Sequence, residues 1–294
     1  MAGPVKTRWT RTEAFNGYLM ISPTLIYALL MLAAPLVMIV AYSFFKDGYL
    51  TVIHEFTTEN YVQAWSDPIF RAILLRSVWV SVLVTAVTVG LAFPVAYFIS
   101  FVLPAQKKSL WLFLITIPFW TSYLIRVFQW KVILSYNGVI NSVLTGLGIV
   151  DHPLQMLNSV GAIAVTLAHS YAPFAILPIF VSLEKIDRSF LEAGQDLGES
   201  RFMTFWRVTL PLAMPGVIGA VMIVFIPTIG DYVTPELIGG GKLPMVANMI
   251  QQNMLKIDNK PLGSAIAVSA MLVVAAIALL FLVLNRRFLR GPKG

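Results

Sequence analysis

The chain has 294 residues, of which 58% are hydrophobic and 12% charged, and it carries a formal net charge of +7 and no cysteine. An ordinary soluble domain has roughly 25% charged residues, so this composition excludes a water-soluble protein and indicates a protein of the lipid bilayer. The lack of cysteine excludes disulfides, a thiolate nucleophile and a cysteine-ligated metal. The basic charge fits cytoplasmic loops that meet anionic lipid, and no soluble domain presents it, so nucleic-acid binding is not expected.

The chain begins with a basic segment and a long apolar run. Residues 1–16 predict a cytoplasmic N-terminal arm, and residues 17–45 predict a first transmembrane helix. A cleavable signal peptide has a shorter apolar stretch, of roughly 7 to 15 residues, and then small residues at the cleavage site. We therefore expect an uncleaved first helix, followed by an external loop over residues 46–74.

Apolar runs of about 18 residues or more with few charges predict membrane-spanning helices. Such runs recur at residues 17–43, 77–102, 110–134, 160–183, 212–231 and 263–284. Some are rich in β-branched residues, but in lipid a segment must satisfy its own backbone polar groups, which favours helix. The predicted fold class is therefore all-α, a polytopic membrane protein with six transmembrane helices.

The distribution of Lys and Arg predicts the orientation of these spans. Most of these residues lie in the N-terminal arm, in the turn at 104–109, in the loop at 184–211 and in the tail at 286–294. The positive-inside rule places all four segments, and so both termini, in the cytoplasm. Five of the helices, with the loop between them, make up the predicted core at 75–285.

Prolines and small residues mark two further features of the spans. Pro118 and Pro173 lie beside polar and aromatic residues, which predicts either kinks that line a pathway or the ordinary enrichment of proline in membrane helices. Gly216, Gly219 and Ala220 make the fifth span thin on one face. Small residues let helices approach closely, so we expect another helix to pack there.

The cytoplasmic loop predicts two short helices. Ser189 and Glu192 have the spacing of a capping box, which predicts the start of the first helix. Gly198 can end this helix in the left-handed conformation, and Ser200 can cap the second one. The sequence therefore predicts an elbow bent at Gly198.

Apolar residues form a face on each of these helices. The first helix has a stripe at helical spacing, and the second has an aromatic cluster; the residues are Phe190, Ala193, Gly194, Leu197, Phe202, Phe205 and Trp206. An isolated helix of about ten residues is marginal in water, so the elbow needs a partner. The partner is the protein's own membrane domain, the lipid surface or another protein.

The loop resembles the EAA loop of permease subunits of binding-protein-dependent (type I) ABC importers. The family pattern is E-A-A, three residues, G, nine residues, I, one residue and L-P; here Val208 replaces the isoleucine, and glycine replaces the third residue. A glycine keeps that position small at some cost in helix propensity. The positions compared are Glu192, Ala193, Gly194, Gly198, Leu210 and Pro211.

The resemblance covers the whole chain and implies that transport and ATP hydrolysis belong to different subunits of a complex. In the family, the first helix of the loop is a coupling helix that sits in a cleft of the ATPase subunit, so Glu192 and Ala193 would be contact positions and Gly198 the hinge. The chain has no Walker sequence, so it is not expected to be an enzyme or to bind a cofactor; ATP and Mg²⁺ would bind two partner ATPase subunits. A second, homologous permease, giving a heterodimer, and an external binding protein complete the expected complex in the bacterial inner membrane.

Two further stretches narrow the expected substrate. Residues 117–134 with the segment that follows them, and residues 230–250, resemble the spermidine/putrescine permease subunits. The resemblance implies polyamine transport, with another small organic cation or amine as the alternative. A polycation that leaves water needs carboxylates or aromatic faces, and the candidates for the pathway are Trp120, Tyr123, Tyr171, Phe174, Asp231 and Glu236. The aromatic residues also fit interfacial anchoring or packing, and Asp231 also fits a helix cap.

Two basic residues argue against a polycation if they face the pathway. Along a straight helix that starts at Leu110 and rises 1.5 Å per residue, Arg126 lies roughly 24 Å further on, near the outer headgroups, and Lys131 follows it. There we expect Arg126 to snorkel or to dock on the external binding protein. His169 beside Tyr171 suggests a proton relay or, more commonly, a hydrogen-bonded structural histidine.

Two other classes of membrane protein fit the sequence less well. An ion-coupled secondary transporter predicts internal repeats and membrane-embedded acids, but the chain shows no convincing repeat and its acids cluster in loops. An integral membrane enzyme needs converging nucleophiles or metal ligands, which the scattered His54, His152 and His169 do not supply.

Overall fold

The computed structural model describes residues 11–48 and 51–289. The basic residues Lys6, Arg8, Arg290 and Lys293, on which the predicted orientation partly rests, lie outside these ranges. The N-terminal half of the described chain contains the helices α1 (Arg11–Tyr42), α2 (Glu59–Ser66), α3 (Pro68–Tyr97), α4 (Ala105–Thr116), α5 (Tyr123–Ile133) and α6 (Val139–Gly146). The C-terminal half contains α7 (Val160–Glu184), α8 (Arg188–Asp196), α9 (Arg201–Thr204), α10 (Leu210–Ile229), α11 (Val233–Leu237), α12 (Val246–Gln251), α13 (Lys260–Leu284) and α14 (Arg286–Leu289).

Shorter elements join or extend these helices. Three are π-helical turns, η1 (Phe98–Val102), η3 (Phe205–Thr209) and η4 (Gln252–Lys256), and η2 (Ile117–Trp120) is a 3₁₀ turn. Strand β1 (Lys46–Asp47) pairs antiparallel with β2 (Val52–Ile53). This two-residue hairpin in the predicted external loop is a small exception to the predicted all-α fold.

Five helical stretches of the described residues are long and apolar enough to cross a membrane, and six if the bent pair α4–α5 counts as one span. They cover residues 16–42, 68–102, 160–184, 201–229 and 260–284. The second begins earlier than predicted, because Asp67 caps it by accepting a hydrogen bond from the Ile69 amide at 2.8 Å. The stretch at 201–229, which corresponds to the predicted span at 212–231, also begins earlier, because α9, η3 and α10 form one continuous helical run.

The predicted third span is broken near Pro118. The helical segments at 105–120 and 123–133 meet at an angle of 89°. Pro118 lies in the 3₁₀ turn η2, where it supplies no backbone N–H, and Thr121 and Ser122 then adopt extended backbone. The predicted position of Arg126, near the outer headgroups, assumed a straight helix. The bend of 89° removes that assumption, so the predicted position of Arg126 is wrong.

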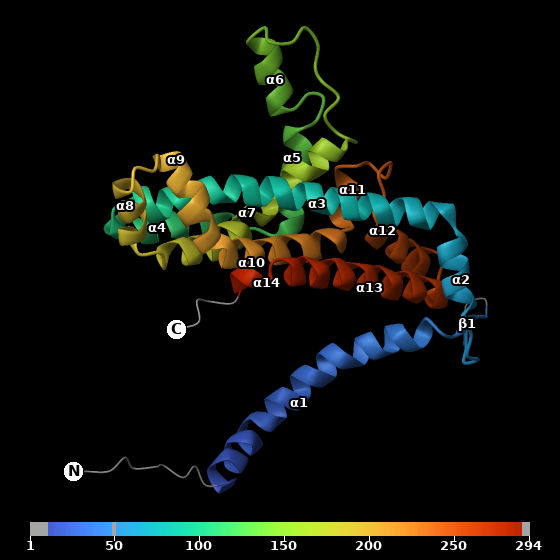
Figure 1. Ribbon diagram of the computed structural model, residues 1–294. Coiled ribbons are helices and arrows are strands. Elements are labelled where there is room, and N and C mark those ends of the chain that lie inside the picture. Colours follow the sequence, from blue (N-terminus) through green and yellow to red (C-terminus); the bar gives the residue numbers. More distant parts are fainter. Residues whose placement is uncertain (1–10, 49–50, 290–294) are drawn as a thin grey trace.

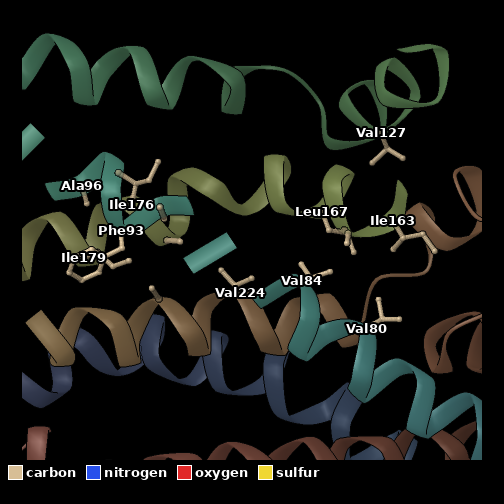
Figure 2. Packing of buried hydrophobic residues seen from close by; sticks show 14 of the residues in the cluster. Val80, Val84, Phe93, Ala96, Val127, Ile163, Leu167, Ile176, Ile179 and Val224 are labelled. Carbon is tan, nitrogen blue, oxygen red and sulfur yellow. The ribbon is translucent and has the colours of Figure 1, made fainter. Parts of the chain in front are cut away.

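Helices α3, α7 and α10 pack against one another as the centre of the bundle, and α13 lies along it (Figure 1). The elbow helices α8 and α9 are at one end of the bundle, and α2 with the hairpin is at the opposite end. Helix α1 contacts α13 and then diverges from the bundle (Figure 1). In the core, buried residues of α3 and α7 face one another, and Val127 of α5 and Val224 of α10 join them (Figure 2).

The close approach of α7 and α10 confirms the predicted thin face of the fifth span. A Cβ atom at Gly216 would clash with the carbonyl oxygen of Pro178 and with the side chain of Ser182. At Gly219, the nearest atom, Cβ of Pro178, would be at an ordinary 3.9 Å. Gly216 is therefore the position at which the contact requires the absence of a side chain.

Candidate functional site

The elbow, residues 188–204, begins with a capped helix. Asp187 accepts a hydrogen bond from the backbone amide of Ser189 at 3.0 Å and is the N-cap of α8. The predicted capping box of Ser189 and Glu192 is therefore wrong: the helix starts one residue before Ser189, and an aspartate takes the capping role. Two hydrogen bonds from Ser189 hold the pKa of Asp187 below its ordinary value. The one from the backbone amide has the larger effect, and the one from the hydroxyl has the smaller.

The bend of the elbow has the predicted geometry. Helix α8 ends at Asp196, and Gly198 follows with φ +87°, in the left-handed region. The amides of Gly198 and Glu199 donate to the carbonyls of Gln195 and Gly194 at 2.9 and 3.1 Å. Ser200 then caps α9 by accepting from the Met203 amide at 3.3 Å. Gly198 and Ser200 thus have the roles that the sequence predicts.

The outer face of the elbow is exposed. Glu192 and Ala193 are both exposed, as are Phe190 at 56%, Leu197 at 86% and Phe202 at 70%. The stripe predicted on the first helix therefore does not pack on the membrane domain of its own chain. Exposed aromatic and aliphatic side chains on a short helix mark a surface for a partner.

Thr204 explains the glycine at position 194. This threonine is 2% exposed, and its Cγ2 and Oγ1 atoms would lie 3.3 and 3.4 Å from a Cβ atom added at Gly194. An alanine methyl would thus fit only tightly against a side chain from the second helix of the elbow, which would have to move by a few tenths of an ångström. The sequence offers no spacing signal for this contact, because the two residues lie on different helices.

The helical run that continues the elbow, η3 and the start of α10, packs on α3 and on the core. The ring of Phe205 meets the rings of Phe93 and Tyr97 edge-on, with centroids 5.5 and 6.1 Å apart. Leu210 packs against the buried core, and Pro211, which follows it, is half-buried at the start of α10. These contacts connect the elbow to α3 and α10.

Ion pairs brace the same end of the bundle. Glu199 in the elbow pairs with Arg207 at 2.9 Å. Glu184, at the end of α7, pairs with Lys108 of α4 at 2.7 Å and accepts from the Ser100 hydroxyl at 3.0 Å. The helix that leads into the elbow is therefore tied to the broken third span.

A second group of predicted residues meets where α5, α7 and α11 come together. The hydroxyl of Tyr123 donates to Oδ2 of Asp231 at 2.8 Å and lies 2.8 Å from the Thr234 hydroxyl. Because the one phenolic proton goes to the carboxylate, Thr234 is the donor in the second contact. Oδ1 of Asp231 accepts from the Val233 amide at 3.0 Å, so Asp231 also caps α11. Asp231 is 7% exposed.

Aromatic rings extend this group. Phe174 meets the ring of Phe119 edge-on at 4.3 Å and that of Tyr171 at 6.4 Å. The guanidinium of Arg126 lies over Phe119, 5.2 Å from the ring centroid, and 5.9 Å from the centroid of Tyr123. We call Phe119, Tyr123, Tyr171, Phe174 and Asp231 the aromatic–carboxylate cluster. It supplies the ring faces and the negative charge that recognise an organic cation.

Two predicted pathway residues lie outside the cluster. Trp120 is 80% exposed, and its ring meets Phe113. Glu236 lies 3.9 Å from Lys256 and is half-exposed.

The sequence did not indicate one member of the cluster, Phe119, or two of its neighbours, Thr234 and Arg126. Phe119 and Thr234 carried no signal of their own, and Arg126 was predicted elsewhere because its position was estimated along a straight helix. His169 accepts a hydrogen bond from the Trp130 indole at 3.1 Å, which fits the structural reading of that residue. Among residues 11–48 and 51–289, no three His, Asp or Glu side chains gather where they could hold a metal ion.

Comparisons with known proteins agree with this architecture. The family model described as "Binding-protein-dependent transport system inner membrane component" matches residues 57–291. The spermidine/putrescine transport system permease protein PotB of Escherichia coli K12 is 34% identical over 248 residues, covering 84% of this chain and 90% of that protein. PotB of Haemophilus influenzae is 34% identical over 253 residues, covering 86% and 88%. The inner membrane ABC transporter permease protein YdcU of E. coli is 29% identical over 242 residues, covering 79% and 77%.

Among solved structures, a chain of a bacterial alginate ABC transporter in complex with an alginate-bound periplasmic protein has the same fold. The TM-score is 0.73 at 18% identity, with 94% of this chain and 96% of that chain covered. Together with the apolar helices, these matches identify a multi-pass protein of the bacterial inner membrane whose partners include ATPase subunits, a second permease and a binding protein. The chain belongs to the family of binding-protein-dependent transport system inner membrane components and is a permease subunit of an ABC importer.

Proposed function

We propose that this permease forms half of the pathway of an ATP-driven importer for polyamines, spermidine or putrescine, delivered by an external binding protein. The observation that carries the proposal is the 34% identity over 84% of the chain to a permease of the spermidine/putrescine system. The aromatic–carboxylate cluster supports it, because buried Asp231 and the rings around it suit an ammonium group that has left water.

In this proposal, two ATPase subunits bind ATP and Mg²⁺, and the elbow transmits their conformational change to the membrane-spanning helices. Glu192, Ala193 and the exposed apolar residues beside them contact the ATPase, while Gly198 sets the angle between the two helices. Gly194 allows the close contact with Thr204, and Leu210 and Pro211 begin the helix that carries the motion into the spans. A second, non-identical permease supplies the other half of the pathway.

The experiment for the substrate is uptake by the complete complex in proteoliposomes, with its own binding protein and ATP inside. Radiolabelled putrescine and spermidine are the substrates, and unlabelled polyamines, choline and basic amino acids are the competitors. Competition by polyamines alone supports the proposal. Uptake that a different amine blocks better identifies another small organic cation as the substrate and contradicts it.

The role of the cluster is tested with Asp231→Asn. Asparagine keeps the size and the helix-capping acceptor of Asp231 but removes the charge. A unit charge about 4 Å from an ammonium is worth about 4 kcal/mol at an effective dielectric constant near 20, so even after screening we expect the uptake rate at limiting substrate to fall at least about tenfold. The matched control is Asp258→Asn, which removes a carboxylate paired with Lys260 outside the cluster. Equal uptake by the two variants contradicts the assignment.

A further inference from the structure

Arg126 is a buried cation that has no polar partner among the described residues. Its side chain comes from α5, just after the break in the third span, and the residue is 8% exposed. The Nε and Nη1 atoms are shielded from solvent and make no hydrogen bond. An unpaired buried charge is costly, and such residues within membrane segments usually mark a functional pathway.

The groups that face the guanidinium are aromatic rings. Its central carbon lies 5.2 Å from the centroid of Phe119 and 5.9 Å from that of Tyr123. Both rings belong to the aromatic–carboxylate cluster, since Phe119 meets Phe174 and Tyr123 donates to Asp231. The guanidinium of Arg126 therefore occupies the faces of two rings that would otherwise be free to bind a substrate ammonium.

We propose that Arg126 is a tethered cation that holds the cation site of the pathway while substrate is absent, and that a substrate ammonium must displace it. This inference rests on the proposed polyamine substrate and names a residue that sets the affinity of the pathway for it. The guanidinium competes for the same ring faces and repels a nearby ammonium. The pathway consequently binds a polyamine weakly, which favours release after the binding protein has delivered it.

The surroundings do not favour a site for an anion at the same place. The faces of Phe119 and Tyr123 carry the negative side of the ring quadrupole, and the carboxylate of Asp231 is hydrogen-bonded to Tyr123. A substrate carboxylate beside Arg126 would meet both. Cations are the ligands that the members of the cluster attract.

The test is direct binding of radiolabelled putrescine to the full permease–ATPase complex in nanodiscs, without the binding protein. Arg126→Gln removes the charge and breaks no hydrogen bond or ion pair of the described residues. We expect it to bind putrescine at least about tenfold more tightly than the wild type, because a like charge at this distance is removed. Arg126→Lys keeps the charge and is expected to bind like the wild type. Lys131→Gln, which removes a charge further along α5, is the matched control.

Uncharged 1,4-butanediol serves as the second ligand, and its binding is expected to be the same for all variants. Size-exclusion chromatography and basal ATP hydrolysis check assembly. If Arg126→Gln does not assemble, Arg126→Met, whose unbranched apolar side chain suits aromatic surroundings, replaces it with the same expected result.

Unchanged, weaker or lost putrescine binding by the neutral variants would overturn the inference. Uptake of putrescine by the wild-type complex tests the substrate separately. If uptake is absent but the neutral variants bind putrescine more tightly, the proposed substrate fails while the role of Arg126 stands.

Discussion

Replacing Gly198 with valine tests whether the shape of the elbow couples ATP hydrolysis to transport. Gly198 has φ +87°, and no atom lies within 4 Å of a Cβ atom added there. An added Cβ atom therefore meets no steric obstacle within this chain, and inside the permease the substitution acts through the backbone. A β-branched residue in the left-handed region costs about 1–3 kcal/mol.

This cost translates into a loss of the docking geometry. At 1.4 kcal/mol for each factor of ten, the population of the elbow with its native bend falls roughly five- to 150-fold. The apparent affinity for the ATPase subunits falls by the same factor if they bind only that bend. Asparagine tolerates the left-handed region best among residues with a side chain, so we expect coupling to decrease in the order Gly, Asn, Ala, Val.

The assay is the dissociation constant of the ATPase subunits from the permease pair in nanodiscs, together with ATP hydrolysis stimulated by the loaded binding protein. Circular dichroism and thermal unfolding of the permease are expected to change little, because Gly198 is exposed and lies outside the core. Wild-type affinity and stimulation in Gly198→Val would refute the reasoning.

Three further predictions concern packing and capping. Gly216→Ala places a methyl group against the backbone of α7 and is expected to destabilise the permease by about 1–3 kcal/mol, measured by thermal unfolding in detergent. Gly194→Ala is expected to be nearly neutral alone but to stabilise the elbow by about 0.5–1 kcal/mol in a Thr204→Ser background, because the methyl group at 3.3 Å is then gone. The pKa of Asp187 is lowered in the folded elbow. Its cap therefore stabilises α8 fully at a pH above the ordinary pKa of the carboxyl group, and this stabilisation is lost as the pH falls through the lowered value. Hydrogen exchange of residues 188–196 across acidic pH measures the loss.

Each of these predictions has a control in the chain. Gly219→Ala, where the added Cβ atom would make an ordinary contact at 3.9 Å, should unfold like the wild type; a loss equal to that of Gly216→Ala would rule out close helix packing as the cause. The Thr204→Ser variant alone sets the baseline for the double variant, and additive effects would mean that the two residues do not compete for space. Asp187→Ala should show fast exchange at every pH, and a pH response that survives in it would assign the effect to another group.

The sequence was sufficient where a local rule decides the structure. The positive φ of Gly198 and the Ser200 cap follow from the intrinsic preferences of those residues, and both were predicted. Long apolar runs also located the spans, since lipid leaves a segment few alternatives to helix. Asp187 was missed as a cap because Ser189 fits the capping pattern equally well, and only the fold shows which residue is used.

The sequence was insufficient where the outcome depends on contacts between distant segments. Pro118 predicted either a kink or the ordinary enrichment of proline in membrane helices, and nothing local decided between the two or gave the size of the bend, 89°. That bend decides where Arg126 lies, and it turns a predicted surface cation into a buried one. The pairing of Tyr123 with Asp231, more than a hundred residues apart, is likewise a property of the packed bundle.

If this chain forms half of the pathway of an ATP-driven polyamine importer and is coupled to the ATPase subunits through the elbow, uptake must depend on ATP and on the shape of the elbow. The most direct measurement is putrescine uptake into proteoliposomes that contain the complete complex, with ATP inside and the binding protein outside, compared with Gly198→Val. We expect uptake that requires both ATP and the binding protein and that falls at least about fivefold in the variant, in line with the lower bound of the backbone cost. Uptake driven by an ion gradient without ATP, or undiminished in the variant, would contradict it.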